Sequence, residues 1–533
     1  MVRVAPPRRK RSRRGLWVAL GLVLVLVAAA AAAVVLFSGV RLDGDRSALA
    51  RVVLQPFAGS VESVTASDAD GRIALLERDG RLVPRRKVVP GETVAITVVV
   101  RRPGWLAWAL GDRRTERLTV KTPVANVRGR WVTVPSGARP RVRFDDAVSE
   151  VAFGATRVHV DGSVAVVPTR LRAGTVEVAA AARPWEELGE PVRVTWFPQA
   201  SEPVVLAQPA PNANVTPLTP LRLTFSQPVA NVLGGEDPTV SSNVRGSWAT
   251  VDTHTLVFRP SGRFGMPFAS DLHVKLPSGV ELVSADRRSV HATDRVAWSV
   301  APASFLRLEQ LLAEEGYLPL TWTPSDDAPP TGARAQVAAA VSPPAGHFDW
   351  TYPNTPSELK ALWQVGEPNE IVRGAVMMFE HDHDLEVDGL VGPQVWHAVL
   401  ADALAGKRRT DGYSYVYVHR DVPQLLTLWH NGNVVLTSPG NTGVPAAPTA
   451  LGTWPVFEHI SVGTMSGTNP DGSHYNDPGI RWISYFHGGE ALHAFNRASF
   501  GTPQSLGCVE LPLDAAAQVW PYTPIGTLVT IEN

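Results

Sequence analysis

An uncharged, strongly apolar stretch near the N-terminus constrains this chain more than any other feature. Leu16–Phe37 contains 22 residues without a charged side chain and directly follows a basic segment. As a helix, it would span about 33 Å, enough to cross the hydrocarbon core of a bilayer. The apolar region of a secretory signal peptide is shorter, about 7–15 residues. The sequence therefore predicts a transmembrane helix over residues 16–37.

The charges that flank this stretch predict its orientation. Residues 1–15 contain seven basic residues and no acidic one. Basic flanks stay in the cytoplasm, so residues 1–15 are expected inside and the rest outside. A cleaved signal peptide is the alternative, because the alanine run Ala28–Ala33 offers a processing site. Both interpretations place the bulk of the chain outside the cytoplasm, and the first places it at the outer face of the cell membrane.

Charge and cysteine content argue against a nucleic-acid-binding protein and against a fold that intramolecular disulfides stabilise. The whole chain has zero net charge, so the residues after position 15 carry a net charge of −7. A nucleic-acid-binding protein would present a basic face on a folded domain, so nucleic acid is not an expected partner. Cys508 is the single cysteine, so the exported part has no intramolecular disulfide, and a lone exported thiol is a candidate reactive group.

The 533 residues predict three to five domains, and the fold class is multidomain and mainly β. Short alternating segments such as Val94–Val100, separated by turn dipeptides such as Asp79-Gly80, predict β-sandwich modules over 48–122 and 123–200. A third unit, 203–301, follows a Pro-rich joint and resembles bacterial Ig-like modules in its segments LRLTFSQPV, TLVFRP and LPSGV. These modules are interpreted as spacers, and the alternative is that one forms part of a catalytic surface.

Residues 302–404 change to helical spacing. Ser304–Leu318 and Ile371–Glu380 are predicted helices, Pro319–Trp363 is predicted to be a long Pro- and Ala-rich loop, and a last helix starts at Gly392-Pro393. LLAEEGYLP together with DLEVDGLVGPQVWHAVL resembles the three-helix peptidoglycan-binding module of bacterial wall enzymes, with a long insertion. Residues 381–384, HDHD, are interpreted as a solvated helix end, with metal binding as the alternative.

The segment His493–Pro512, HAFNRASFGTPQSLGCVELP, carries the strongest chemical pattern. A thiolate is a strong nucleophile, and an imidazole within hydrogen-bond reach holds it ionised. His493 precedes Cys508 by 15 residues, and Gly507 permits a tight turn in which amide groups face a developing oxyanion. The alternative interpretation is a buried and inert cysteine.

Residues 412–533 alternate as β-strands around an Asn431-Gly432 hairpin, and several motifs stand in order: VYV at 416–418, PTALGTWPV, YFHGGEALH, GTPQSLGCVELP and PIGTLVTI. In this order they resemble the L,D-transpeptidases of the bacterial cell wall, with a YkuD-type catalytic domain similar to the actinobacterial form. The resemblance implies a β-rich catalytic domain over 412–533.

The resemblance also implies roles for particular residues. Cys508 takes the position of the nucleophile and His493 that of the catalytic base, with His487 as its competitor. Ser505 and Gly507 match the family's Ser-x-Gly-Cys and are expected to support the oxyanion site, while Leu506 and Glu510 depart from the usual residues. The further candidates for substrate binding are His487, Tyr475, Trp482 and Glu510. Neither a metal nor an organic cofactor is implied.

The implied reaction is a two-step acyl transfer on peptidoglycan stem peptides. Cys508 forms a thioester with release of terminal D-Ala, and a second stem's amine resolves it to a 3→3 cross-link. Carbapenems are expected to acylate the same cysteine. Two alternatives stay open: an L,D-carboxypeptidase or endopeptidase on the same fold, and a non-catalytic wall-binding scaffold.

Overall fold

The computed structural model describes residues 13–45, 47–241, 244–283, 291–292, 295–325 and 330–533. Most of the predicted cytoplasmic segment, residues 1–12, lies outside them. The chain divides into two compact units: residues 1–206 with 224–232 and 279–292, and residues 207–223, 233–278 and 293–533.

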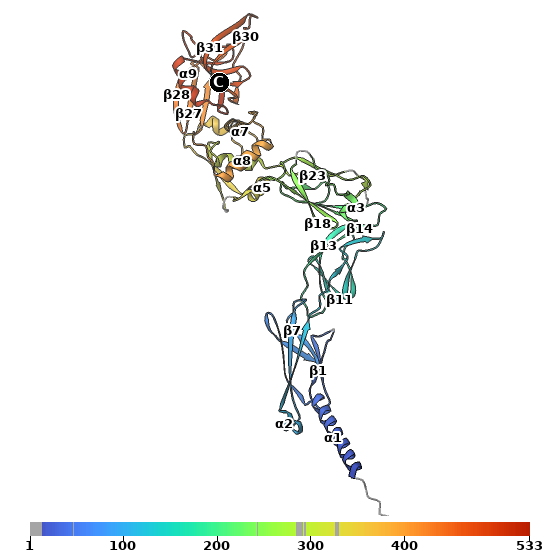
Figure 1. The fold of residues 1–533 in the computed structure, drawn as a ribbon. Helices are drawn as coiled ribbons and strands as arrows, with labels where there is room; N and C mark the ends of the chain where they lie inside the picture. The colour runs from blue at the N-terminus through green and yellow to red at the C-terminus, as the bar shows by residue number, and fades with distance from the viewer. Residues whose placement is uncertain (1–12, 46, 242–243, 284–290, 293–294, 326–329) are drawn as a thin grey trace, which may run out of the picture. The chain divides into compact units, whose positions relative to one another are not determined.

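Helix α1, Arg13–Leu36, covers the predicted apolar span (Figure 1). Its segment Trp17–Leu36 has a mean hydropathy of 2.9, and none of it is buried. Length and composition suit either a membrane anchor or a signal sequence. Ser38 follows the helix, and its hydroxyl donates to the carbonyl of Val35 at 2.9 Å, so the chain turns directly into the first β module.

The first β module contains two four-stranded sheets, ordered β1-β2-β6-β5 and β4-β3-β7-β8. The valines and isoleucines at alternate positions of β7 are buried in the core, as their period of two predicts. Between β7 and β8 lies a short helix that the sequence analysis missed. The elements are β1 Val40–Asp43, β2 Ala50–Leu54, β3 Ser60–Asp68, β4 Gly71–Ile73, β5 Leu75–Arg78, β6 Arg81–Pro84, β7 Thr93–Arg101, α2 Gly104–Leu110 and β8 Arg113–Lys121.

The strands of the second β module are hydrogen-bonded in one six-stranded sheet. Its central path is β10-β14-β13-β11-β12, and β9 pairs with β11. The pairing of β11 with β12 shifts register twice, which bends these long strands. The strands are β9 Val127–Arg128, β10 Trp131–Val134, β11 Arg141–Phe153, β12 Thr156–Val166, β13 Gly174–Ala181 and β14 Val192–Pro198.

Residues 204–300 form the third β region. Strand β15 pairs with β21 in parallel, β18 with β19 as an antiparallel hairpin, and β23 lies between β16 and β20. The elements are β15 Val204–Gln208, β16 Asn214–Val215, β17 Leu221–Phe225, α3 Val229–Leu233, β18 Gly246–Asp252, β19 Thr255–Pro260, β20 Asp271–Lys275, β21 Glu281–Val283, β22 His291–Ala292 and β23 Arg295–Val300.

The helical region differs from the prediction. Pro319–Trp363 is not a loop: it contains a β-hairpin and two helices, so the described part of residues 302–405 has five helices instead of three. Proline and alanine composition masked these elements, although Leu320 and Trp322 are buried. The elements are α4 Phe305–Glu314, β24 Leu320–Pro324, α5 Ala333–Val341, β25 Gly346–Trp350, α6 Ser357–Ala361, α7 Glu370–Asp382 and α8 Pro393–Ala405.

The C-terminal β region contains two sheets, ordered β28-β27-β26-β34-β29 and β30-β31-β32-β33. The predicted Asn431-Gly432 hairpin is present, with positive φ at both residues. Residues 462–480 are rich in glycine, yet β30 and β31 pair there as a long hairpin. The elements are β26 Ser414–His419, β27 Leu425–His430, β28 Asn433–Pro439, β29 Gly452–Pro455, β30 Glu458–Thr468, β31 His474–His487, β32 Glu490–Ala494, β33 Val509–Leu511, α9 Leu513–Val519, η1 Trp520–Tyr522 and β34 Leu528–Glu532.

The helical region and the five-stranded sheet share one hydrophobic core, which contains Tyr415 and Trp429 beside residues of α4, α7 and α8. The indole of Trp429 donates to the carbonyl of Asn354 at 3.0 Å. A Cβ on Gly374 of α7 would lie 2.5 Å from the carbonyl oxygen of Gly526, so α7 approaches the sheet as closely as a glycine allows. The helices therefore support the sheet directly.

Candidate active site

Two neighbouring parallel strands place the candidate residues on one face. In the pairing of β32 with β33, Leu492 lies opposite Val509 and His493 opposite Glu510. Leu492 and Val509 point into the core between the sheets. Because side chains alternate along a strand, His493 and Glu510 point to the other face, and Cys508, two residues before Glu510, shares it. The alternation thus brings together residues 15 positions apart.

These side chains line a cavity of about 320 Å³. Tyr475, predicted as a groove aromatic, belongs to its wall, as does Leu506 at the position that departs from the family pattern. The lining residues are Met465, Asn469, Tyr475, Asp477, Ile480, Gly489, His493, Phe495, Arg497, Gln504, Ser505, Leu506, Cys508 and Glu510. A second cavity of about 700 Å³ shares Asp477, Ile480 and Phe495 with the first, so the two adjoin.

His493 is buried and oriented by the backbone. Its Nδ1 lies 3.0 Å from the carbonyl oxygen of Ala494. A carbonyl only accepts hydrogen bonds, so Nδ1 carries the proton and Nε2 is left with its lone pair. Burial lowers the pKa of His493 below its ordinary value, so the ring is neutral at neutral pH. The backbone carbonyl of Ala494 therefore orients the imidazole ring.

Cys508 is a half-buried neutral thiol in this structure. Its Sγ donates to the carbonyl oxygen of Gly489 at 3.7 Å, and burial raises its pKa to about 12. The backbone amide of Ala491 opposes this rise of the pKa, and the carboxylates of Glu510 and Glu490 contribute to it. Among the contacts of the described residues, no hydrogen bond joins this thiol to His493. The resting site is therefore a thiol and a neutral imidazole rather than an ion pair.

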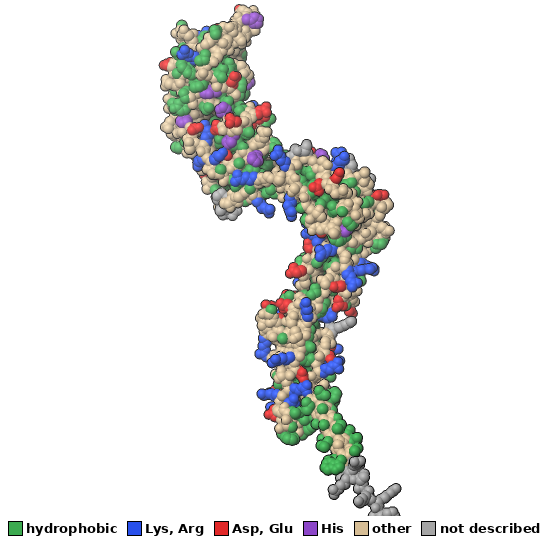
Figure 2. Space-filling model, viewed as in Figure 1, with side chains coloured by type: hydrophobic (Ala, Val, Ile, Leu, Met, Phe, Trp, Pro, Cys, Tyr) green, Lys and Arg blue, Asp and Glu red, His purple; other side chains and the backbone are tan. Residues whose placement is uncertain are grey.

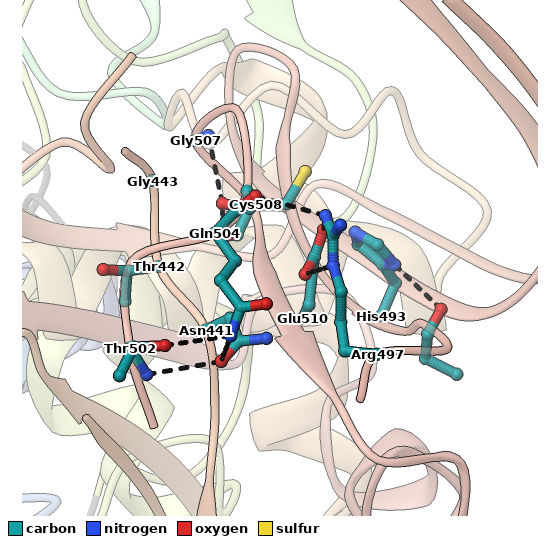
Figure 3. Close-up of polar contacts among 12 residues, drawn as sticks. Asn441, Thr442, Gly443, His493, Arg497, Thr502, Gln504, Gly507, Cys508 and Glu510 are labelled. Atoms are coloured by element: carbon teal, nitrogen blue, oxygen red, sulfur yellow. Dashed lines mark hydrogen bonds and ion pairs between the residues drawn. The ribbon is translucent and has the colours of Figure 1, made fainter. Parts of the chain in front are cut away.

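Ser505 and Gly507 hold the turn before the cysteine. The Ser505 hydroxyl donates to the carbonyl of Cys508 and accepts from the amide of Gly507 at 3.2 Å (Figure 3). Gly507 has φ +116°, and a Cβ there would lie 3.2 Å from Glu490 Oε1. Because the Gly507 amide is already bonded, it is not free for an oxyanion. The Cys508 amide has no acceptor among the described contacts.

Glu510 is neutralised by a residue that the sequence analysis did not identify. Arg497 Nη2 and Nε lie 2.6 and 2.8 Å from its two carboxylate oxygens (Figure 3). The same guanidinium donates to the carbonyl of Gln504 at 3.2 Å and lies 4.6 Å from the Phe495 ring centre. The acidic residue at position 510 therefore leaves no unpaired charge in the cavity. The sequence signal for such a partner is Glu510 itself, because an acidic residue at this position requires a nearby cation such as an arginine.

A buried amide anchors the loop that carries Arg497 and Ser505. Asn441 Oδ1 accepts from the amide of Gly501 at 3.0 Å. It also accepts from Gln504 Nε2 at 3.2 Å (Figure 3). The backbone of Asn441 also bonds in both directions to Glu510, at 2.9 Å each. Asn441 is thus a further positioning residue missed from sequence, because its partners lie about 60 to 70 residues later.

The structure does not bring His487 and Trp482 to the cavity. His487 Nδ1 lies 3.2 Å from Glu490 Oε2, and its ring packs against that of Trp454, with 4.5 Å between ring centres and a tilt of 36°. Trp482 packs against the core between the sheets. These two predictions of groove-lining residues are therefore not supported by the positions of the side chains.

The HDHD segment at residues 381–384 ends helix α7. His383 bridges the carbonyl of Phe379 and the carboxylate of Asp402, at 2.8 and 2.7 Å. In the part of the chain that the structure describes, no cluster of three His, Cys, Asp or Glu side chains has metal-binding geometry.

Comparison with protein families gives a match over this region. Residues 413–531 match the L,D-transpeptidase catalytic domain. The C-terminal part of the chain thus carries an L,D-transpeptidase catalytic domain, while the match leaves the preceding modules unassigned. No match is found among curated protein sequences.

Solved structures similar to the chain are L,D-transpeptidases. One from Mycobacterium smegmatis has 13% identity and a TM-score of 0.21, covering 62% of this chain and all of its own. One from Mycobacterium tuberculosis has 12% identity and a TM-score of 0.20, covering 61% and 96%. The catalytic domain of the E. faecium enzyme acylated by ertapenem has 23% identity and a TM-score of 0.20, covering 23% and 99%.

Proposed function

We propose that the protein is a membrane-anchored L,D-transpeptidase that forms 3→3 cross-links between peptidoglycan stems, with Cys508 as nucleophile and His493 as general base and acid. One observation carries this proposal: Cys508 and a buried, neutral His493 face the same cavity from adjacent strands within a region that matches the catalytic domain family. Helix α1 is the proposed anchor.

The first half-reaction needs proton transfer as the thiol attacks. With a raised pKa, Cys508 is a thiol until substrate binds, so His493 Nε2 takes its proton as sulfur adds to the carbonyl carbon of the diaminopimelate residue at its L-centre. The Cys508 amide is the candidate donor to the oxyanion. Collapse breaks the amide bond to terminal D-Ala, whose nitrogen takes the proton from His493, and a thioester remains.

The second half-reaction returns the enzyme to its resting state. The side-chain amine of a second stem attacks the thioester carbonyl, His493 accepts the amine's proton, and the proton then passes to the departing Cys508 sulfur. The larger adjoining cavity offers space for this second stem. Water in place of the amine would give the carboxypeptidase reaction instead.

Product analysis tests this proposal. The full-length protein in detergent is incubated with a disaccharide-tetrapeptide, and the products are separated and sequenced by mass spectrometry. A dimer with a 3→3 bond, absent with Cys508→Ala, is expected. Tripeptide without dimer would change the assignment to an L,D-carboxypeptidase. If neither product depends on Cys508, the scaffold interpretation replaces the enzyme.

A further inference from the structure

Helix α2 presents two tryptophans to solvent, which is unusual for a soluble domain. Trp105 and Trp108 are 58% and 85% exposed, whereas Leu106 between them is buried. Arg102 fixes the helix end by donating to the carbonyls of Leu110 and Gly111. The two tryptophans therefore lie on a helix whose end is fixed by hydrogen bonds. Large exposed aromatic groups mark interaction surfaces.

Contacts place this element at the C-terminal end of α1. The Trp105 ring meets the Phe57 ring edge-on, 6.4 Å between centres, and the Phe57 amide donates to the carbonyl of Phe37, one residue beyond α1. On β8, Arg114 Nη1 donates to the carbonyl of Val35 at 2.7 Å. Two separate contacts thus hold the β7-α2-β8 tip at the level where α1 ends.

The exposed apolar surface is continuous with the helix. Leu36 and Phe37 are 64% and 48% exposed, and Phe57, Trp105 and Trp108 extend the surface sideways from them. Figure 2 shows hydrophobic side chains along α1 and over α2. Arginines 113 and 114 at this tip are paired with Glu62 and Glu116. The surface is therefore defined by its aromatic rings rather than by an excess of charge.

We propose that α2 is a second membrane contact, with Trp105 and Trp108 inserted in the lipid headgroup region of the outer leaflet beside α1. Tryptophan prefers this depth because its ring is apolar and its N–H is polar. The partner is a lipid surface, since the patch adjoins the helix proposed to cross the bilayer. This inference rests on the proposed anchor. Its consequence is that the first β module is held against the membrane rather than hinged above it.

Tryptophan fluorescence in reconstituted vesicles tests the inference. The full-length protein and Trp105→Phe/Trp108→Phe are reconstituted into phosphatidylcholine–phosphatidylglycerol vesicles, with and without brominated acyl chains. Subtracting the emission spectrum of the variant from that of the unmodified protein leaves the emission of Trp105 and Trp108. The expected difference emission is blue-shifted, quenched by brominated lipid and shielded from aqueous acrylamide. Phenylalanine keeps the contact with Phe57, so the module stays folded, and circular dichroism checks this.

The controls separate failure of the contact from failure of the anchor. Trp196→Phe, at a ring buried in the core of the second β module, should give a difference emission that brominated lipid does not quench. If the protein floats with vesicles after alkaline washing but the α2 emission is quenched by acrylamide and not by bromine, the inference is overturned and the anchor stands. If the protein does not float, the anchor and the inference both fail.

Discussion

The pair formed by Arg497 and Glu510 predicts an asymmetric loss of stability. The Glu510 side chain is only 5% exposed and the Arg497 side chain is 31% exposed. Arg497→Gln strands a buried carboxylate, whereas Glu510→Gln leaves a guanidinium that can turn toward water. Removing one partner of a buried pair costs about 3–5 kcal/mol, and partial exposure of Arg497 places this variant at about 3 kcal/mol.

The reverse variant, Glu510→Gln, should cost about 1 kcal/mol, because the remaining charge can be solvated. Arg497→Gln/Glu510→Gln should be more stable than Arg497→Gln alone, because no charge is left buried. The coupling energy of the cycle is expected at about 1–2 kcal/mol. The loop that Arg497 holds through Gln504 should loosen in Arg497→Gln and recover in part in the double variant.

Differential scanning calorimetry of the full-length variants measures these differences. A loss of about 3 kcal/mol corresponds to a fall in Tm of about 6–12 °C for the transition of the catalytic region. Hydrogen exchange of residues 497–511 reports whether the change is local. Equal losses for the two single variants, or strict additivity in the double variant, would refute the argument that Glu510 depends on Arg497 for its charge.

Four further perturbations follow from the site and from the contacts that support it. Burial lowers the pKa of His493 below 6.5, so the unfolded imidazole binds more protons than the folded one. The stability that this residue contributes is complete above pH 6.5 and is lost as the pH falls below that value. The acid limb in the pH profile of carbapenem acylation should likewise lie below pH 6.5, and an acid limb above pH 6.5 contradicts a neutral buried base. His493→Ala should slow acylation about 100-fold or more, while His487→Ala, outside the cavity, should retain a near wild-type rate in stopped-flow measurements. Gly507→Ala places a Cβ near Glu490 in a backbone with φ +116°. The variant should lose about 1–3 kcal/mol of unfolding free energy, measured by calorimetry, and should not be acylated. An unchanged Tm would show that the turn relaxes freely. Gly374→Val should lower the Tm of the catalytic region although it lies on α7, and no change there would contradict the shared core.

The sequence predicted the parts of this fold that have local patterns. The uncharged stretch became α1, and the Asn431-Gly432 hairpin is present. Predictions from local composition were wrong where the pairing of strands determines the structure. Residues 462–480 are rich in glycine and polar groups, yet β30 and β31 pair through them because each strand satisfies the other's backbone groups.

In the candidate site too, residues with a local chemical pattern could be predicted, whereas residues that act through long-range contacts could not. His493 and Cys508 were found because a thiol near a histidine has a chemical meaning without any structure. Asn441 and Arg497 were not found, because a buried amide and a paired arginine acquire their roles only through contacts made by folding. Helix α2 escaped because seven residues are too few to establish a helical period.

Intact-protein mass spectrometry tests the central claim, that Cys508 forms the acyl-enzyme, most directly. The full-length protein and Cys508→Ala are incubated in parallel with a carbapenem and with a disaccharide-tetrapeptide, and the adduct is mapped by peptide sequencing. The proposed mechanism predicts one adduct per chain, located on Cys508 and absent from Cys508→Ala, whose circular dichroism spectrum is unchanged. An adduct that persists in Cys508→Ala, or no adduct with either compound, would contradict it.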